Sequence, residues 1–103
     1  MNRDSEKYLE RTLCAEVKKM GGVAYKFVSP GHRGVPDRMC VLPNGFIMFV
    51  ELKSKGKKPS PLQELEIARI KSLGGHVSVV DSYTFLLFVL SVMRAYSNTS
   101  ETC

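Results

Sequence analysis

The sequence predicts an α/β (α+β) fold in which helices flank a mixed β-sheet, with the element order α-β-β-β-α-β-α. Three observations predict it. An N-terminal segment has apolar residues at helical spacing, short apolar runs are bounded by turn residues, and helix start and stop signals follow later in the chain. The chain has 103 residues, the length of one domain. We expect this domain to span residues 1–96, followed by a polar C-terminal tail over residues 97–103.

The first part of the chain predicts a helix and a strand before a loop. Apolar residues recur at helical spacing from about Ser5 to Met20, and Gly21-Gly22 then ends the helix. The segment from Val23 to Val28 has the composition of a short strand. Residues 29–36 are rich in glycine and proline, which indicates a loop.

Two strands joined by a tight turn are predicted next, over residues 37–42 and 46–53. Pro43-Asn44-Gly45 between them is a hairpin turn signal. The second of these strands is apolar from Phe46 to Val50, which is typical of a central strand covered on both faces.

The last third of the chain predicts a helix, a strand and a helix. Ser60 suits the N-cap of a helix and Pro61 its first position, and Gly74-Gly75 ends this helix. Residues 76–80 form the predicted fourth strand. A very apolar last helix should run from Ser82 to about Tyr96.

Charge and cysteine content indicate the kind of partner and compartment. Lys and Arg outnumber Asp and Glu by 15 to 10, and the net charge of +5 favours a polyanion such as nucleic acid. The three cysteines form no CxxC pair, which indicates reduced thiols in the cytoplasm rather than a disulfide framework or a zinc site. We expect no signal peptide and no membrane span, since the apolar run from Phe85 to Leu90 is too short to cross a bilayer.

Glu51 and Lys53 end the apolar run of the predicted central strand. They stand two residues apart, so both side chains point to the same face. A charge at the end of an apolar run is expensive unless it is paired or binds a metal. For an isolated E-x-K, however, the commoner explanation is that the strand leaves the core there and its charges are solvated.

Asp37 changes this interpretation through the register of the hairpin. If residues 43–45 form a three-residue loop, Leu42 pairs with Phe46. Counting outward from that pair, Asp37 falls opposite Glu51, with Cβ atoms about 5 Å apart. The two carboxylates would repel each other, and Mg²⁺ or Mn²⁺ between them would remove the conflict. A two-residue loop would instead turn Asp37 to the other face.

These residues belong to a longer ordered set that resembles a known family. Gly34-Val35-Pro36-Asp37, thirteen residues and then Glu51-Leu52-Lys53 resemble the PD-(D/E)XK nuclease motif. More narrowly, the chain from Glu10 to about Val80 resembles a stand-alone VRR-NUC domain. The likeness also includes Gly21-Gly22, Tyr25-Lys26-Phe27, Gly31 to Arg38, Phe49 to Lys53 and Leu62-Gln63.

The resemblance implies a restriction-endonuclease-like fold and hydrolysis of DNA phosphodiesters with Mg²⁺ or Mn²⁺. By its motifs, Asp37, Glu51 and the carbonyl of Leu52 would bind the metal. Lys53 would position or activate the attacking water and stabilise charge on the phosphate.

Two more residues match the family but have competing interpretations. Glu10 matches the acidic residue of the first helix, as a metal ligand and catalytic residue, while Glu6 lies one turn earlier on the same face. Gln63 matches a glutamine near the active site. Ser60-x-x-Gln63 is also a capping box, and we expect that one amide cannot fully satisfy both roles.

The partner implied by the resemblance is DNA, in branched form such as a Holliday junction or a flap, cut by a homodimer with two symmetric sites. Residues 85–93 of the apolar last helix are a candidate interface, with core packing as the alternative. A non-catalytic nucleic-acid-binding module with the same fold is the alternative function. Candidates for phosphate contact, with plain surface charge as the alternative, are Lys26, His32, Arg33, Arg38, Lys55, Lys57 and Lys58.

Overall fold

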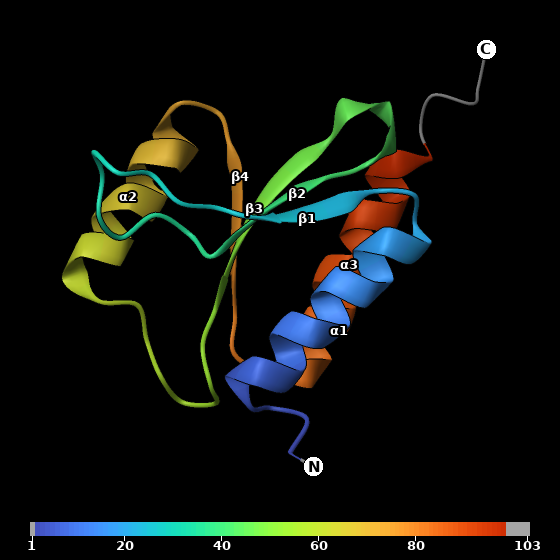
Figure 1. The fold of residues 1–103 in the computed structure, drawn as a ribbon, viewed down its shortest axis with the longest axis horizontal. Coiled ribbons are helices and arrows are strands. Elements are labelled where there is room, and N and C mark those ends of the chain that lie inside the picture. Colours follow the sequence, from blue (N-terminus) through green and yellow to red (C-terminus); the bar gives the residue numbers. More distant parts are fainter. Residues whose placement is uncertain (1, 99–103) are drawn as a thin grey trace.

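The computed structural model describes residues 2–98, which form three helices and a four-stranded sheet (Figure 1). The predicted order of helices and strands is confirmed. The elements are α1 (Glu6–Lys19), β1 (Val23–Lys26), β2 (Arg38–Val41), the 3-10 turn η1 (Pro43–Gly45), β3 (Ile47–Leu52), α2 (Pro61–Ser72), β4 (His76–Val80) and α3 (Tyr83–Ser97).

The sheet is mixed, with the strand order β1-β2-β3-β4. β1, β2 and β3 pair antiparallel, and β4 runs parallel to β3. β3 therefore lies inside the sheet, as its apolar sequence predicts. α1 and α3 lie side by side against one face, and α2 lies apart from them, beside β4 (Figure 1).

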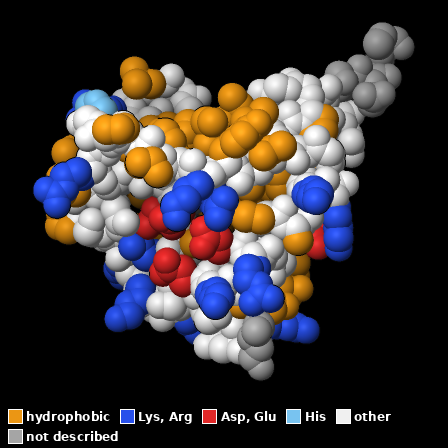
Figure 2. Space-filling model, in the orientation of Figure 1, with side chains coloured by type: hydrophobic (Ala, Val, Ile, Leu, Met, Phe, Trp, Pro, Cys, Tyr) orange, Lys and Arg blue, Asp and Glu red, His pale blue; other side chains and the backbone are white. Residues whose placement is uncertain are grey.

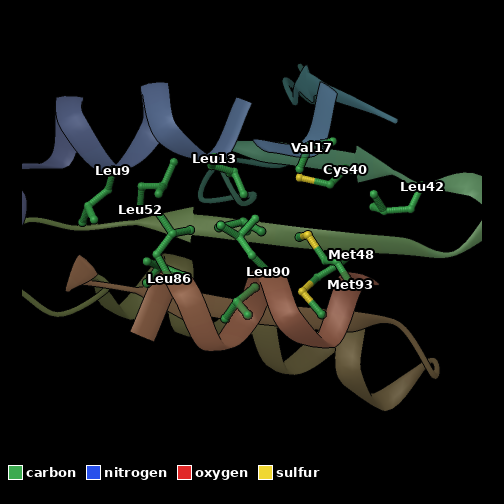
Figure 3. Packing of buried hydrophobic residues seen from close by; sticks show 13 residues of the cluster. Leu9, Leu13, Val17, Cys40, Leu42, Met48, Leu52, Leu86, Leu90 and Met93 are labelled. Carbon is green, nitrogen blue, oxygen red and sulfur yellow. The ribbon is translucent and has the colours of Figure 1, made fainter. Parts of the chain in front are cut away.

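The hydrophobic core lies between the sheet and the pair α1 and α3 (Figure 3). β3 contributes alternate residues, Met48, Val50 and Leu52, because side chains of a strand alternate between the two faces. Glu51 must then point to the opposite face, toward α2. The other members of the core are Leu9, Leu13, Val17, Cys40, Leu42, Val80, Leu86, Val89, Leu90 and Met93.

The turn between β2 and β3 is a three-residue loop, as the first of the two registers requires. The Leu42 amide donates to the Phe46 carbonyl at 2.8 Å, and Val41 then pairs with Ile47. Asn44 and Gly45 both have left-handed backbone angles, with φ of 68° and 76°. Asparagine and glycine are the residues that adopt this conformation most easily, so the local sequence selects the odd-length loop.

The C-terminal boundary differs from the expectation. Ser97, predicted to open a polar tail, is the last residue of α3 and is buried. Its carbonyl accepts a hydrogen bond from the Asn44 side chain, which ties the end of the helix to the β2–β3 turn. The rest of the predicted tail beyond Asn98 lies outside the described residues.

The described residues include two of the three cysteines. Cys14 and Cys40 are free thiols, and burial raises the pKa of Cys40 to about 12, which keeps it protonated. Cys103 lies outside the described residues. Among residues 2–98, no helix is both long and apolar enough to cross a membrane.

Candidate active site

Asp37 and Glu51 are brought together by the hairpin register. The last residues of the β2–β3 ladder are Arg38 and Val50, so Asp37, the residue before β2, falls opposite Glu51. The Asp37 Oδ2 atom accepts a hydrogen bond from the Leu52 amide at 2.9 Å, which fixes its carboxylate against β3. The predicted juxtaposition of the two acidic residues is therefore present.

Glu51 is a buried charge with incomplete pairing. Its side chain is 1% exposed, and its Oε2 atom accepts from Gln63 Nε2 at 2.9 Å and lies 3.1 Å from Lys53 Nζ. Its Oε1 atom is buried and accepts no hydrogen bond from the described residues. Burial, and then the negative charge of Asp37, raise the pKa of Glu51, while Lys53 lowers it in part.

Gln63 both caps α2 and contacts Glu51. The capping box is present, because the Ser60 amide donates to Gln63 Oε1 at 2.8 Å and the Gln63 amide donates to Ser60 Oγ at 3.2 Å. The Gln63 side-chain nitrogen is left free by this cap and donates to Glu51. The oxygen and the nitrogen of this one amide therefore serve different partners, so the cap leaves Gln63 able to contact Glu51.

Gly34 sets the distance between the loop before Asp37 and the start of α2. Its φ is +85°, and a Cβ atom at this position would lie 2.8 Å from the carbonyl carbon and oxygen of Leu62 and 3.0 Å from the Gln63 nitrogen. Only glycine combines that backbone angle with such close contact. The Gly34 contact therefore helps to place both Asp37 and Gln63.

Glu10, the predicted ligand from the first helix, is engaged elsewhere. Its Oε2 atom lies 2.9 Å from Arg38 Nε, and Arg38 Nη1 also donates to the Ala24 carbonyl at 3.0 Å. Glu6, the alternative, is exposed on α1. Within residues 2–98, no group of three or more His, Cys, Asp or Glu side chains is placed to hold a metal ion. The structure thus brings Asp37 and Glu51 together but leaves Glu10 in an ion pair.

The predicted phosphate contacts fall into two groups. Lys26, Arg33, Lys55, Lys57 and Lys58 are exposed, with Lys55 Nζ 3.7 Å from Asp4 Oδ2. Arg38 is different, because its side chain is partly buried and its guanidinium is held by Glu10 and Ala24. Figure 2 shows acidic side chains gathered on one face of the molecule, with Lys and Arg side chains around them and hydrophobic side chains above.

His32 and Glu66 form a contact that the sequence analysis did not identify. Glu66, on α2, is 8% exposed, and its Oε2 atom lies 3.8 Å from His32 Nδ1. Its position was open to prediction, since it follows Gln63 by three residues and so shares a face of the helix. Because glutamate is charged, however, the residue type alone predicts that Glu66 is exposed.

The acidic pair fits a hard divalent cation. Both residues offer carboxylate oxygens, the ligands that Mg²⁺ and Mn²⁺ prefer. The Glu51 Oε1 atom is buried without a hydrogen bond from the described residues, and Asp37 raises the Glu51 pKa, so a cation would relieve both costs. The Leu52 carbonyl belongs to the strand residue whose amide already binds Asp37.

Comparison with known proteins places this geometry in a family. The chain is 58% identical over 77 residues to "Putative nuclease p44" of Acyrthosiphon pisum secondary endosymbiont phage 1. The aligned region covers 75% of this chain and 83% of that protein. A solved structure described as a VRR-NUC domain superposes with a TM-score of 0.79 at 31% identity, covering 84% of this chain and 94% of the other. The chain belongs to the VRR-NUC family. No family profile matches the sequence. The VRR-NUC fold and the mixed sheet flanked by helices agree with the predicted fold class.

Proposed function

We propose that this VRR-NUC protein is a metal-dependent DNA endonuclease that hydrolyses phosphodiester bonds. The observation that carries the proposal is the set Asp37, Glu51 and Lys53, gathered where β2 and β3 meet, with Lys53 Nζ 3.1 Å from Glu51 Oε2. Two carboxylates beside one ammonium group are the parts needed to hold a cation and to neutralise charge on a phosphate. Membership of the VRR-NUC family supports the same function.

Each residue of the site has a distinct proposed role. Asp37, Glu51 and the Leu52 carbonyl would hold Mg²⁺ or Mn²⁺, which supplies Lewis-acid stabilisation of phosphate charge when bound. Lys53, oriented by Glu51, would position the attacking water and stabilise the negative charge that develops on the phosphate. Gln63 would orient the Glu51 carboxylate through its 2.9 Å hydrogen bond.

Glu10 remains a proposed ligand that must first leave its partner. Its carboxylate is held by Arg38, which directly follows Asp37 in the chain. We expect the phosphate of bound DNA to compete for the Arg38 guanidinium, because arginine binds phosphate and carboxylate with the same planar donors. Release from Arg38 would make the Glu10 carboxylate available as a further oxygen ligand.

The proposed substrate is branched DNA, bound by the exposed basic side chains and cut by a homodimer. The net charge of +5 supports binding to a polyanion. The last helix supports the dimer in part. Leu86, Val89 and Leu90 belong to the core, whereas Phe85 and Phe88 are exposed, with stacked rings 5.8 Å apart. An exposed aromatic pair of this kind is suited to an interface between two copies.

Cleavage of a labelled four-way junction in parallel reactions tests the function. We expect products with Mg²⁺ or Mn²⁺ and none with EDTA. Ca²⁺ should also fail, because its longer bonds and looser geometry do not align the reacting groups. The matched control is Lys53→Ala, which should bind the junction and leave it intact. Robust cleavage in EDTA would overturn the metal mechanism. Binding without cleavage in every metal would instead support the non-catalytic module.

A further inference from the structure

A cavity of about 180 Å³ lies between the loop of residues 29–36, α2 and the sheet. Phe27 and Phe49 line it from the sheet, with ring centroids 5.3 Å apart and ring planes tilted by 43°. Val35 lines it from the loop and Ile70 from α2. The surface that they form is mainly apolar, and the polar residues that also line the cavity are Ser29, His32, Glu66 and Arg69.

This cavity lies near the candidate active site along both β3 and α2. Phe49 stands two residues before Glu51 on β3, so both side chains lie on the same face of the sheet. Glu66, which also lines the cavity, stands one helical turn after Gln63, the residue that binds Glu51. A DNA strand held at Asp37 and Glu51 would thus pass close to the cavity.

Glu66 gives the cavity an unusual polar group. The residue is 8% exposed. His32 Nδ1 at 3.8 Å and Arg69 Nε at 3.4 Å both approach its Oε2 atom, at distances longer than ordinary N–H···O hydrogen bonds. A mostly buried carboxylate held only by these two longer contacts can accept further N–H donors.

The chemistry of the lining excludes most parts of a nucleic acid as the occupant. A phosphate would exchange its hydration for a mainly apolar surface on which Arg69 is already paired with Glu66. A sugar offers no flat surface for the two phenylalanine rings. A nucleobase has a π-face that stacks on aromatic side chains and an edge with N–H groups that a carboxylate can accept. The volume of about 180 Å³ is below the roughly 300–1,000 Å³ of pockets for drug-sized ligands and suits a single ring system.

We propose that this cavity binds one unpaired base of the DNA substrate, stacked against Phe27 and Phe49 with its N–H groups donating to Glu66. The inference rests on the proposed cleavage of DNA and explains how a branched or flapped substrate, which offers unpaired bases, is distinguished from a continuous duplex. Guanine is the preferred base, because its pairing edge presents two adjacent N–H donors to the carboxylate.

The proposal is tested by measuring the binding of matched pairs of DNA substrates. EDTA is present, so the DNA stays intact. A series of labelled junctions carries a single unpaired guanine at successive positions along one arm, and each has a twin with an abasic site there. Fluorescence anisotropy measures both affinities. At one position we expect the guanine junction to bind about tenfold more tightly, within the range that base stacking supplies. Equal affinities at every position would overturn the proposal.

Substitutions connect this preference to the cavity. Glu66→Gln keeps the size of the side chain but removes the charge, and Phe49→Leu removes one ring. Both should reduce the preference for guanine to less than threefold. The control Glu64→Gln removes an exposed carboxylate from the same helix and should leave the preference unchanged. Circular dichroism establishes that each variant is folded.

The remaining outcomes are distinguishable from failure of the proposed function. If Glu66→Gln strengthens binding to both twins equally, Glu66 only repels phosphate and the base site is wrong. If light scattering shows that Phe49→Leu separates a dimer while the guanine preference persists, the cavity belongs to an interface between copies. In both cases metal-dependent cleavage by the unchanged protein would still stand. If the unchanged protein does not cleave DNA with Mg²⁺ or Mn²⁺, by contrast, the proposed function is overturned.

Discussion

Replacing Glu51 with glutamine should stabilise the protein while it abolishes cleavage. Glu51 is 1% exposed, its Oε1 atom is buried without a hydrogen bond from the described residues, and Asp37 repels its charge. Leaving a buried polar group unsatisfied costs roughly 1–3 kcal/mol. Glutamine has no charge to bury and its amide can donate to Asp37, although the attraction to Lys53 is lost. We expect a net gain of about 1 kcal/mol, or roughly 4–8 °C in the melting temperature of a domain this small.

Thermal unfolding followed by circular dichroism measures this effect with and without metal. In EDTA, Glu51→Gln should melt above the parent protein, and the surface control Glu64→Gln should melt close to it. Mn²⁺ at about one hundred times its dissociation constant should add about 2.7 kcal/mol to the parent and little to Glu51→Gln. The order of the two melting temperatures should therefore reverse. A Glu51→Gln protein that melts at or below the parent in EDTA would refute the account of Glu51 as a destabilising charge.

The stability difference between Glu51→Gln and the parent protein should decrease as the pH falls. The pKa of Glu51 in the folded protein is raised above its ordinary value of 4.5, so folding favours the protonated form. The destabilisation by Glu51 is fully present above the folded pKa and is lost as the pH falls toward 4.5. The advantage of Glu51→Gln in EDTA should shrink over that interval. An advantage that stays constant down to pH 4.5 would show that charge is not its cause.

Five further variants and one salt titration test the site. Lys53→Ala should abolish turnover yet keep DNA affinity, and normal cleavage by this variant would contradict the role proposed for Lys53. Asp37→Asn should abolish turnover and also lose metal affinity, which calorimetry measures. DNA affinity should fall steeply with salt, because each neutralised phosphate releases counterions. Gly34→Ala should lower both stability and cleavage, since its Cβ would lie 2.8 Å from backbone atoms of α2. Deleting Asn44 should disable cleavage by turning Asp37 to the other face, while Asn44→Gly should retain it; a folded, fully active deletion variant would contradict the register argument.

Local signals were enough to predict the elements of the fold. Ser60 was predicted as an N-cap, and Ser5 and Ser82 as the approximate starts of the other two helices. Each of the three accepts a hydrogen bond from the third residue after it, as N-cap residues do, and a helix begins directly after each. Strand ends were less accurate, because the last residues of a strand depend on a neighbour to pair with. Ser97 was misjudged for a related reason, since its burial depends on the distant β2–β3 turn.

The acidic pair was predictable from the sequence, whereas the ion pairs around it were not. Asp37 and Glu51 belong to one hairpin, and the length of its loop fixes which residues lie opposite each other. The contact between Glu10 and Arg38 joins residues 28 positions apart in the chain. It depends on how α1 rotates and shifts against the sheet, which no local pattern determines.

β3 combines a regular buried pattern on one face with a buried charge on the other. Met48, Val50 and Leu52 follow the pattern of a buried strand, and each contributes roughly 1.5–3 kcal/mol when its side chain is fully removed from water. Glu51 departs from that pattern on the opposite face. The core on one side of the strand can therefore offset a buried, incompletely paired charge on the other. Departures from local sequence rules concentrate at functional sites, because only function retains a residue that costs stability. The position of Glu51 therefore supports the proposed site.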